Sequence, residues 1–463
     1  MKVNKVCCIG AGYVGGPTMA VIALKCPEIE VTVVDVSKEK IDAWNGPFDQ
    51  LPVYEPGLKE VVKESRGRNL FFSTDIDGAI DRSEMIFMAV NTPTKKDGEG
   101  AGMAANLKYI EACAKNIALV AREDKIIIEK STLPVRTAEK IKEILLKYGR
   151  KDVNFEILSN PEFLAEGTAI QDLFKSDRVL IGGDTTESGQ NAVNALLDIY
   201  AQWIPKEKIL TTNVWSSELA KLASNAMLAQ RISSINSLSA LCEKTGADID
   251  ELSKAIGMDH RIGTEFLKTS VGFGGSCFQK DLLNLVYLCQ FYGLGEVADY
   301  WYRIVKINDY QKNRFAQKII DGMGGDIKDK IITILGWAFK ANTNDSRESP
   351  AIYVTNNLLK AGAKIKIYDP LVEKERIIMD LKNLWESLSI TEQEMKKRSS
   401  SVIIVEDQTT AINDSMAVAI LTEWEEFKYL KWDVISKFSK VFDGRKIIKK
   451  DDLNMDSIYS IGV

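Results

Sequence analysis

Histidine is almost absent from this chain: His260 is the single one in 463 residues. This scarcity excludes catalytic sites of the Ser-His-Asp and Cys-His types and metal sites built from several histidines. The seven cysteines are an odd number for a chain of this length, and they contain no Cys-x-x-Cys pair. We therefore expect reduced thiols and no metal site. Acid and base chemistry must then come from Lys, Asp, Glu, Cys or water.

An excess of positive charge is also missing, because 60 basic residues stand against 65 acidic ones, for a net charge of -5. Such a balance offers no broad field for nucleic acid, so an anionic ligand must be held by local cations. No apolar run reaches the length of a membrane span, and no charged and then apolar leader opens the chain. With 45% hydrophobic residues, the sequence indicates a globular, cytoplasmic protein of about two to four domains.

The N-terminal region carries a glycine loop between a strand and a helix. A short apolar strand is expected at residues 3–9, followed by Gly10-Ala11-Gly12-Tyr13-Val14-Gly15 and a helix through Leu24. The next strand, Val31 to Val34, ends in Asp35. A Gly-x-Gly-x-x-Gly loop in this context, with an acidic residue about 20 positions later, is typical of dinucleotide binding. The glycines let the backbone approach a pyrophosphate at the helix N-terminus.

The residue at the end of the second strand indicates which dinucleotide is bound. The Asp35 carboxylate would accept hydrogen bonds from the adenosine ribose and repel a 2′-phosphate. We therefore expect NAD, although Lys38 and Lys40 nearby leave NADP open. A glycine turn in an α/β unit that binds no nucleotide is the structural alternative.

Three further strands each end in a polar cluster. We expect the strands at Met85–Val90, Lys125–Glu129 and Glu156–Leu158. The clusters are Asn91-Thr92-Pro93-Thr94, Lys130-Ser131-Thr132 and Ser159-Asn160-Pro161-Glu162. Since the carboxyl ends of parallel strands meet at one edge of a sheet, these loops should line one cleft with the glycine loop.

The middle of the chain is predicted to be helical. A single long helix is expected from Ser216 to Glu243, with Gly246 as its stop signal. Lys221 and Asn225 share one face of it, as a functional pair or as part of a solvated surface. Its many Ala and Ser residues permit close helix packing, so it is a candidate dimer seam. Further helices are expected at Asp248–Ile256, Leu282–Gln290 and Val297–Met323.

One thiol stands out in the segment Val271–Asp281, whose central residues are Gly272-Phe273-Gly274-Gly275-Ser276-Cys277. Cys277 comes just before a predicted helix, whose N-terminus favours a thiolate, and Lys280 adds a cation within about one turn. Cys277 is thus a candidate covalent nucleophile. An ordinary half-buried cysteine beside a glycine turn is the alternative.

The C-terminal region repeats the opening pattern of a strand, a glycine turn and a strand that ends in aspartate. The two strands are Lys330–Leu335 and Lys364–Tyr368, and they precede Gly336 and Asp369. Later strands are expected at Ala417–Leu421 and Lys440–Phe442, and Glu394–Ser401 is expected to be a polar loop. Because the turn Gly336-Trp337-Ala338-Phe339-Lys340 lacks the other two glycines, its ligand should differ from a dinucleotide.

Eight stretches, in this order, resemble the UDP-glucose/GDP-mannose dehydrogenase family nearly end to end. They are GAGYVGGPT, VNTPT, EKSTLPVRT, LSNPEFLAEGTA, ELAKLASNA, GFGGSCFQKD, GWAFKANTNDSRES and FDGR. The resemblance implies an α/β protein with an N-terminal Rossmann domain for NAD, residues 1–213. It also implies a long central helix within a helical dimerisation region, residues 214–323, which carries the nucleophile loop. A Rossmann-like domain for the UDP-sugar, residues 324–463, would follow.

The family also implies a reaction. A sugar CH2OH group, here that of UDP-glucose, is oxidised to a carboxylate with two NAD, which gives UDP-glucuronate. Cys277 would hold the intermediate aldehyde as a thiohemiacetal and then as a thioester, which water hydrolyses. The implied catalytic residues are Cys277, Lys221, Glu162, Asn225, Asp281 and Thr132.

Together with the glycine loop, the resemblance assigns binding residues. NAD contacts are expected at Gly10, Gly12, Tyr13, Val14, Gly15, Asp35, Lys40, Val90, Asn91, Thr92, Pro93, Thr94, Ser131, Thr132, Glu166, Cys277, Lys280 and Arg347. Substrate contacts are expected at Glu162, Phe163, Leu164, Ala165, Glu166, Lys221, Asn225, Arg261, Lys268, Phe273, Gly274, Phe339, Lys340 and Arg445. Arg261 matches an arginine that reaches the sugar of the neighbouring subunit, whereas without the family it would be read as a solvated cation.

The family implies a homo-oligomer paired through the central helix, as a dimer or as a hexamer of three dimers under allosteric control. Three other functions stay open at this point. The chain could oxidise another nucleotide sugar, such as UDP-N-acetyl-mannosamine or GDP-mannose. It could be a two-electron hydroxyacid dehydrogenase, or a catalytically silent nucleotide-sugar sensor.

Overall fold

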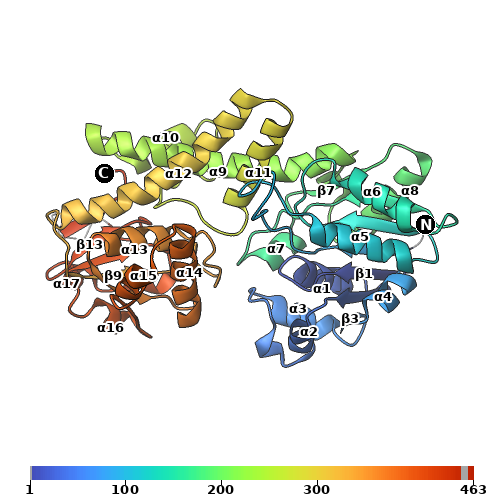
Figure 1. Ribbon diagram of the computed structural model, residues 1–463, viewed down its shortest axis with the longest axis horizontal. Coiled ribbons are helices and arrows are strands. Elements are labelled where there is room, and N and C mark those ends of the chain that lie inside the picture. The colour runs from blue at the N-terminus through green and yellow to red at the C-terminus, as the bar shows by residue number, and fades with distance from the viewer. Residues whose placement is uncertain (1–2, 450–456) are drawn as a thin grey trace. The chain divides into compact units, whose positions relative to one another are not determined.

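The computed structural model describes residues 3–449 and 457–463. Contacts within the chain group these residues into two compact units, shown with their helices and strands in Figure 1. Unit 1 comprises the residues up to Ser224 together with Leu283–Tyr292, and unit 2 comprises Asn225–Leu282 together with Gly293–Val463. The three-part division expected from the sequence stays a prediction.

Unit 1 is built on an eight-stranded sheet in the order β3-β2-β1-β4-β5-β6-β7-β8. Its strands are β1 Lys5–Ile9, β2 Glu30–Val34, β3 Leu70–Ser73, β4 Met85–Met88, β5 Lys125–Glu129, β6 Phe155–Ser159, β7 Val179–Gly183 and β8 Ile209–Asn213. The first six are parallel and follow the order 3-2-1-4-5-6 of a dinucleotide-binding Rossmann sheet. The expected N-terminal Rossmann fold is confirmed.

Helices cover both faces of this sheet because successive buried side chains of its strands point to opposite sides. The first face is packed by α1 Gly15–Lys25, α3 Leu58–Ser65, α7 Ala169–Phe174 and α8 Glu187–Tyr200. The second face is packed by α4 Ile76–Arg82, α5 Lys108–Val120 and α6 Thr137–Tyr148. α2 Lys38–Asn45 follows β2, and its Trp44 joins the core of the first face. The carboxyl edge of the sheet is left to loops.

The expected central helices are present. They are α9 Val214–Thr245, α10 Ile249–Gly257, α11 Phe278–Phe291 and α12 Gly295–Gly322. α9 is 32 residues long and ends where Gly246 takes a left-handed φ of 79°, a conformation that glycine adopts without strain. α11 begins four residues earlier than expected, directly after Cys277.

Unit 2 contains a six-stranded parallel sheet in the order β11-β10-β9-β12-β13-β14. The strands are β9 Ile331–Leu335, β10 Lys364–Tyr368, β11 Val402–Ile404, β12 Ala417–Ile420, β13 Lys440–Asp443 and β14 Ile458–Ser460. The order again reads 3-2-1-4-5-6 within this half, so the second Rossmann-like sheet is confirmed. Its helices after α12 are α13 Pro350–Lys360, α14 Lys374–Ser387, α15 Glu392–Ser399, α16 Gln408–Ile412 and α17 Trp432–Ile435.

The polar loop expected at Glu394–Ser401 was wrong, because most of it belongs to α15. The Thr391 side chain accepts a hydrogen bond from the Glu394 backbone N–H and caps the helix. In addition, Arg398 pairs with Glu394 one turn away, at 3.0 Å. These local contacts stabilise a helix with no buried residue.

Within residues 3–449 and 457–463, every helix is too short or too polar to span a bilayer. All seven cysteines lie in this part of the chain as free thiols.

Candidate active site

The glycine loop lies between β1 and α1 at the carboxyl edge of the sheet of unit 1. Gly10 has a φ of 117°, and a side chain there would overlap the backbone of Ala89. A Cβ at Gly15 would likewise overlap the carbonyl oxygen of Gly10. At Gly12, by contrast, an added Cβ would meet no atom within 4 Å. Backbone N–H groups at the start of α1 are therefore open to a phosphate-sized anion at Gly12.

Asp35 lies at the end of β2 and is 8% exposed. Its carboxylate accepts hydrogen bonds from the Ala11 N–H at 3.0 Å and the Ser37 N–H at 2.9 Å. Lys40 contributes a third contact at 3.4 Å. A carboxylate has about four acceptor sites, so one remains for a ribose hydroxyl. The open space at Gly12 and this remaining acceptor fit NAD.

Tyr13 ties the glycine loop to the segment after β6. Its hydroxyl donates a hydrogen bond to Glu55, and Gly167 donates its backbone N–H to both side chains, at 3.2 Å and 2.8 Å. Burial first, and then the hydrogen bond to Glu55, raise the pKa of Tyr13. Tyr13 is therefore neutral and can donate. Glu55 is buried, and it was not among the predicted site residues.

Glu162 is bound to a buried lysine. Its Oε2 lies 2.7 Å from Nζ of Lys130, whose side chain is 2% exposed. Lys130 also donates to Asn160 at 3.0 Å and to Tyr200 at 3.2 Å. Burial alone would lower the pKa of Lys130, but Glu162 and Tyr200 outweigh it and raise the pKa. A charged Lys130 therefore fixes the direction in which the Glu162 carboxylate points.

Two of the predicted loops are bonded to each other. The Ser131 hydroxyl donates to the Val90 carbonyl oxygen at 2.6 Å, and the Thr92 hydroxyl donates to the Thr132 carbonyl oxygen at 3.1 Å. These bonds hold the ends of β4 and β5 together. The remaining predicted residues of unit 1 lie in the loops after β1, β4 and β6: Val14, Asn91, Pro93, Thr94, Leu164, Ala165 and Glu166.

Lys221 projects from the first half of α9 and is 7% exposed, so the expected alternative of a solvated helix face does not apply to it. Its ammonium lies 5.3 Å from the centre of the Phe163 ring. The Arg178 guanidinium lies 4.0 Å from the same ring. Two cations thus lie against the Phe163 ring, and their charge would stabilise an anionic oxygen beside them.

In unit 2, Cys277 immediately precedes α11 and is the exposed member of the seven cysteines. One turn on, the buried Asp281 carboxylate accepts a hydrogen bond from the Asn225 amide at 2.6 Å. The Lys280 ammonium lies 3.4 Å from the other oxygen of Asp281. The structure thus brings together Cys277, Lys280, Asp281 and Asn225.

The loop before Cys277 packs against the first turn of the second Rossmann-like sheet. A Cβ at Gly274 would meet the Glu348 carbonyl oxygen at 2.6 Å, and one at Gly275 would meet the Phe339 ring at 3.0 Å. The Gly275 N–H donates to the Arg347 carbonyl oxygen at 2.8 Å. Phe273 is held by two hydrogen bonds with the Asn308 amide. The glycines here permit close packing of two backbones.

Arg445 supports the same turn, because its guanidinium donates to the carbonyl oxygens of Phe339 at 2.6 Å and Leu421 at 2.7 Å. Asp369 shows that this turn differs from the glycine loop of unit 1. Its carboxylate accepts hydrogen bonds from the backbone N–H groups of Trp337, Ala338, Leu371 and Val372 and from the indole N–H of Trp424. With five donors bound, Asp369 has no acceptor for a ribose.

The other predicted substrate cations of unit 2 are more exposed. Arg261 is 78% exposed and makes a two-pronged contact with Asp259, at 3.0 Å and 2.6 Å. Lys268 is exposed, and Lys340 is half-buried, 5.7 Å from the Phe339 ring centre. Nothing in their local contacts brings these three together.

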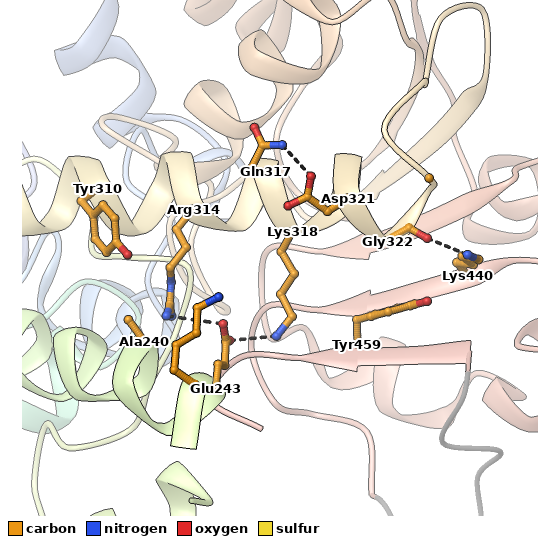
Figure 2. Close-up of a pocket in the computed structure, with 12 residues that line it drawn as sticks. Ala240, Glu243, Tyr310, Arg314, Gln317, Lys318, Asp321, Gly322, Lys440 and Tyr459 are labelled. Atoms are coloured by element: carbon orange, nitrogen blue, oxygen red, sulfur yellow. Dashed lines mark hydrogen bonds and ion pairs between the residues drawn. The ribbon is translucent and has the colours of Figure 1, made fainter. Parts of the chain in front are cut away.

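A cavity of about 730 Å³ lies elsewhere in unit 2 and contains none of the predicted site residues. Figure 2 shows Glu243 at its centre, between Arg314 and Lys318. Glu243 lies 2.8 Å from the Lys318 ammonium and 3.6 Å from the Arg314 guanidinium. Glu243 pairs with both cations, so the cluster joins α9 to α12.

The structure also adds residues that sequence reasoning did not assign: Lys130, Asn160, Tyr200, Glu55 and Arg178. Lys130 and Asn160 stood in the polar clusters, which was a usable signal. Glu55 and Arg178 carry no local signal because their partners are distant in the chain.

Comparison with known proteins agrees with this geometry. Residues 4–204 match the NAD binding domain of the UDP-glucose/GDP-mannose dehydrogenase family, residues 215–310 its central domain, and residues 333–450 its UDP binding domain. UDP-glucose 6-dehydrogenase 3 of Arabidopsis thaliana is 56% identical over 99% of this chain and 97% of its own length. UDP-glucose 6-dehydrogenase of Gallus gallus is 56% identical over 98% of this chain and 90% of its own length.

A UDP-glucose dehydrogenase structure from Pyrobaculum islandicum superimposes with a TM-score of 0.83 at 28% identity, over 100% of this chain and 98% of that one. The matches cover all three parts of the family and almost every residue. The chain therefore belongs to the UDP-glucose/GDP-mannose dehydrogenase family.

Proposed function

We propose that this protein oxidises UDP-glucose to UDP-glucuronate with NAD, in two oxidations and one hydrolysis. The observation that carries the proposal is the exposed Cys277 at the N-terminus of α11, beside Asp281, Asn225 and Lys280. Relatives named UDP-glucose 6-dehydrogenase, more than half identical over nearly the full length, support UDP-glucose as the substrate.

The NAD contacts of unit 1 are the glycine loop and Asp35, with the loops after β4 and β5 beside them. When bound there, NAD accepts a hydride in each oxidation. In the first step, Lys221 takes the proton released by the sugar hydroxyl. Lys221 and Asn225 then stabilise the negative charge that develops on the sugar oxygen.

Cys277 supplies the covalent step. Its thiolate adds to the aldehyde carbon and forms a thiohemiacetal, and the second oxidation turns this adduct into a thioester. Water then attacks the thioester carbon and Cys277 leaves as a thiolate. Glu162 accepts the proton of this water, while Thr132 and Asp281 position the water. Lys130 keeps the Glu162 carboxylate oriented for this role.

Phe163, Leu164, Ala165 and Glu166 contact the sugar. Lys268, Phe273, Gly274, Phe339, Lys340 and Arg445 contact the UDP group, and the cations among them balance the diphosphate. Arg347 and Lys280 contact NAD.

The protein acts as a cytoplasmic homo-oligomer that pairs through α9, as a dimer or as a hexamer of three dimers under allosteric control. In support, α9 exposes large apolar side chains, with Met227 52% and Leu241 60% exposed. Such side chains on one helix suit burial against a second copy. Arg261, 78% exposed, would then reach the substrate of the neighbouring subunit.

The test is NADH formation with purified protein and a panel of nucleotide sugars. We expect UDP-glucose to be the preferred substrate by kcat/KM over UDP-N-acetyl-mannosamine and GDP-mannose. A preference for either of the other two would assign the chain to a sibling activity. If none of the three sugars yields NADH although UDP-glucose binds, the chain is instead a catalytically silent nucleotide-sugar sensor.

A further inference from the structure

Two glutamates are buried side by side in unit 1, outside every role given above. Glu129 is the last residue of β5 and is 1% exposed, and Glu218 lies in the second turn of α9 and is 3% exposed. Both side-chain oxygens of Glu129 are buried away from every donor among the described residues, and the group within hydrogen-bonding reach of them is the Glu218 carboxylate. Two carboxylates cannot bond without a donor, so the pair holds a proton.

The proton belongs to Glu129. Burial and then the charge of Glu218 raise the pKa of Glu129 well above its ordinary value. Burial raises the pKa of Glu218 as well, but backbone N–H groups and the hydrogen bond from Glu129 oppose that rise. Glu218 is therefore the charged acceptor, and the Arg136 guanidinium is a charged group near it.

Glu218 also caps α6. Its two oxygens accept the backbone N–H groups of Arg136 at 2.7 Å and Ala138 at 2.8 Å. The helix has no cap of its own, because Arg136 at its N-cap has a left-handed φ of 76° and makes no capping bond with its side chain. A charged acceptor at a helix N-terminus is favoured by the unpaired N–H groups there.

The segment between these contacts is the loop of Lys130, Ser131 and Thr132. Glu129 precedes the loop, and Arg136 and Ala138 follow it. Glu218 lies three residues before Lys221 on α9. One buried acid pair thus connects the end of β5, the start of α6 and the helix that carries Lys221.

We propose that Glu129 and Glu218 are positioning residues that share one proton. The pair holds the Ser131–Thr132 loop in a fixed position relative to Lys221. Glu129 acts as the fixed donor, and Glu218 as the acceptor for three donors at once. The inference rests on the proposed roles of Thr132 and Lys221. It predicts different effects for the same Glu→Gln change at the two positions.

The experiment compares Glu129→Gln with Glu218→Gln in the full-length protein. A glutamine at 129 still donates and cannot lose a proton, so kcat should stay within about twofold of wild type. A glutamine at 218 turns its NH2 group toward a backbone N–H, so one cap bond is lost. We expect kcat to fall at least about tenfold there, with faster amide exchange at Arg136 and Ala138.

The pH profile gives a second readout. At alkaline pH, wild type loses the shared proton and places two charges together, so kcat should fall, whereas Glu129→Gln should not show that fall. If Glu218→Gln does not fold, Glu129→Leu replaces it in the experiment. Leucine removes the donor, so we expect amide exchange at Arg136 and Ala138 to be faster than in wild type.

Equal effects of the two glutamine variants, or a Glu129→Leu variant that matches Glu129→Gln in kcat and amide exchange, would overturn the inference. A failure of the proposed function would give a different result. Wild type would then form no NADH from UDP-glucose, while the difference in amide exchange between the variants would remain.

Discussion

At the scale of single residues, the account depends on the chemistry of Cys277. The six other cysteines are buried, so Cys277 is the thiol with access to a substrate. Replacing it by Ser leaves a poor nucleophile, and turnover should fall on the order of 10³-fold or more, with NAD binding unchanged. Cys289→Ser, in the helix that follows Cys277, is the matched control, since burial raises the pKa of Cys289. A Cys277→Ser enzyme with near-normal kcat would remove the thiol from the mechanism.

Glu162 allows the hydrolysis step to be separated from the oxidations. In Glu162→Gln the amide can still accept a hydrogen bond from Lys130, but it cannot take a proton from water. We expect a burst of NADH in the first turnover and then a sugar thioester on Cys277. Mass spectrometry of the intact protein measures this adduct. A slow variant without any adduct would assign Glu162 to an earlier step.

At the scale of helices and strands, Glu243 joins the end of α9 to α12 and to the C-terminal strand. It pairs with Lys318 and Arg314, whose side chains are 20% and 14% exposed, and it accepts the Gly462 N–H at 2.9 Å. Glu243→Gln leaves both cations without a counter-charge. Unfolding in urea should show a loss of about 1–3 kcal/mol.

The control for this variant is Glu386→Gln, which breaks a pair with Lys382 on α14. Both side chains of that pair are more than half exposed, so its loss should cost about 0–0.5 kcal/mol. Equal stability of the two variants would mean that the Glu243 cluster contributes nothing beyond a surface pair.

Elements with strong local signals could be predicted from the sequence. The glycine loop, Asp35 and the turn before Cys277 are contiguous patterns, and the structure places them as expected at strand ends and at a helix start. The missed helix α15 had a signal as well, since Thr391 and Glu394 have the spacing of a capping box. Glu218 had none, because its partner Arg136 is 82 residues away and only the fold brings them together.

At the scale of the whole molecule, the exposed Arg261 gives a test of assembly. Arg261→Ala and Cys277→Ala should each be nearly inactive alone. In mixed dimers, one of the two sites would combine an intact Cys277 with an intact Arg261 from the neighbour. Mixed dimers purified with two different tags after co-expression should then have about half of wild-type activity. Mixed dimers as inactive as the separate variants would place Arg261 in its own subunit or outside the reaction.

The central claim is that one enzyme carries the sugar through both oxidations while the aldehyde stays bonded to Cys277. The most direct measurement is the ratio of NADH formed to UDP-glucose consumed, with an aldehyde trap such as hydroxylamine in the reaction. The account predicts two NADH for each UDP-glucuronate and no trapped aldehyde, because the thiohemiacetal holds the intermediate. One NADH per UDP-glucose, with free UDP-aldehyde captured by the trap, would contradict it.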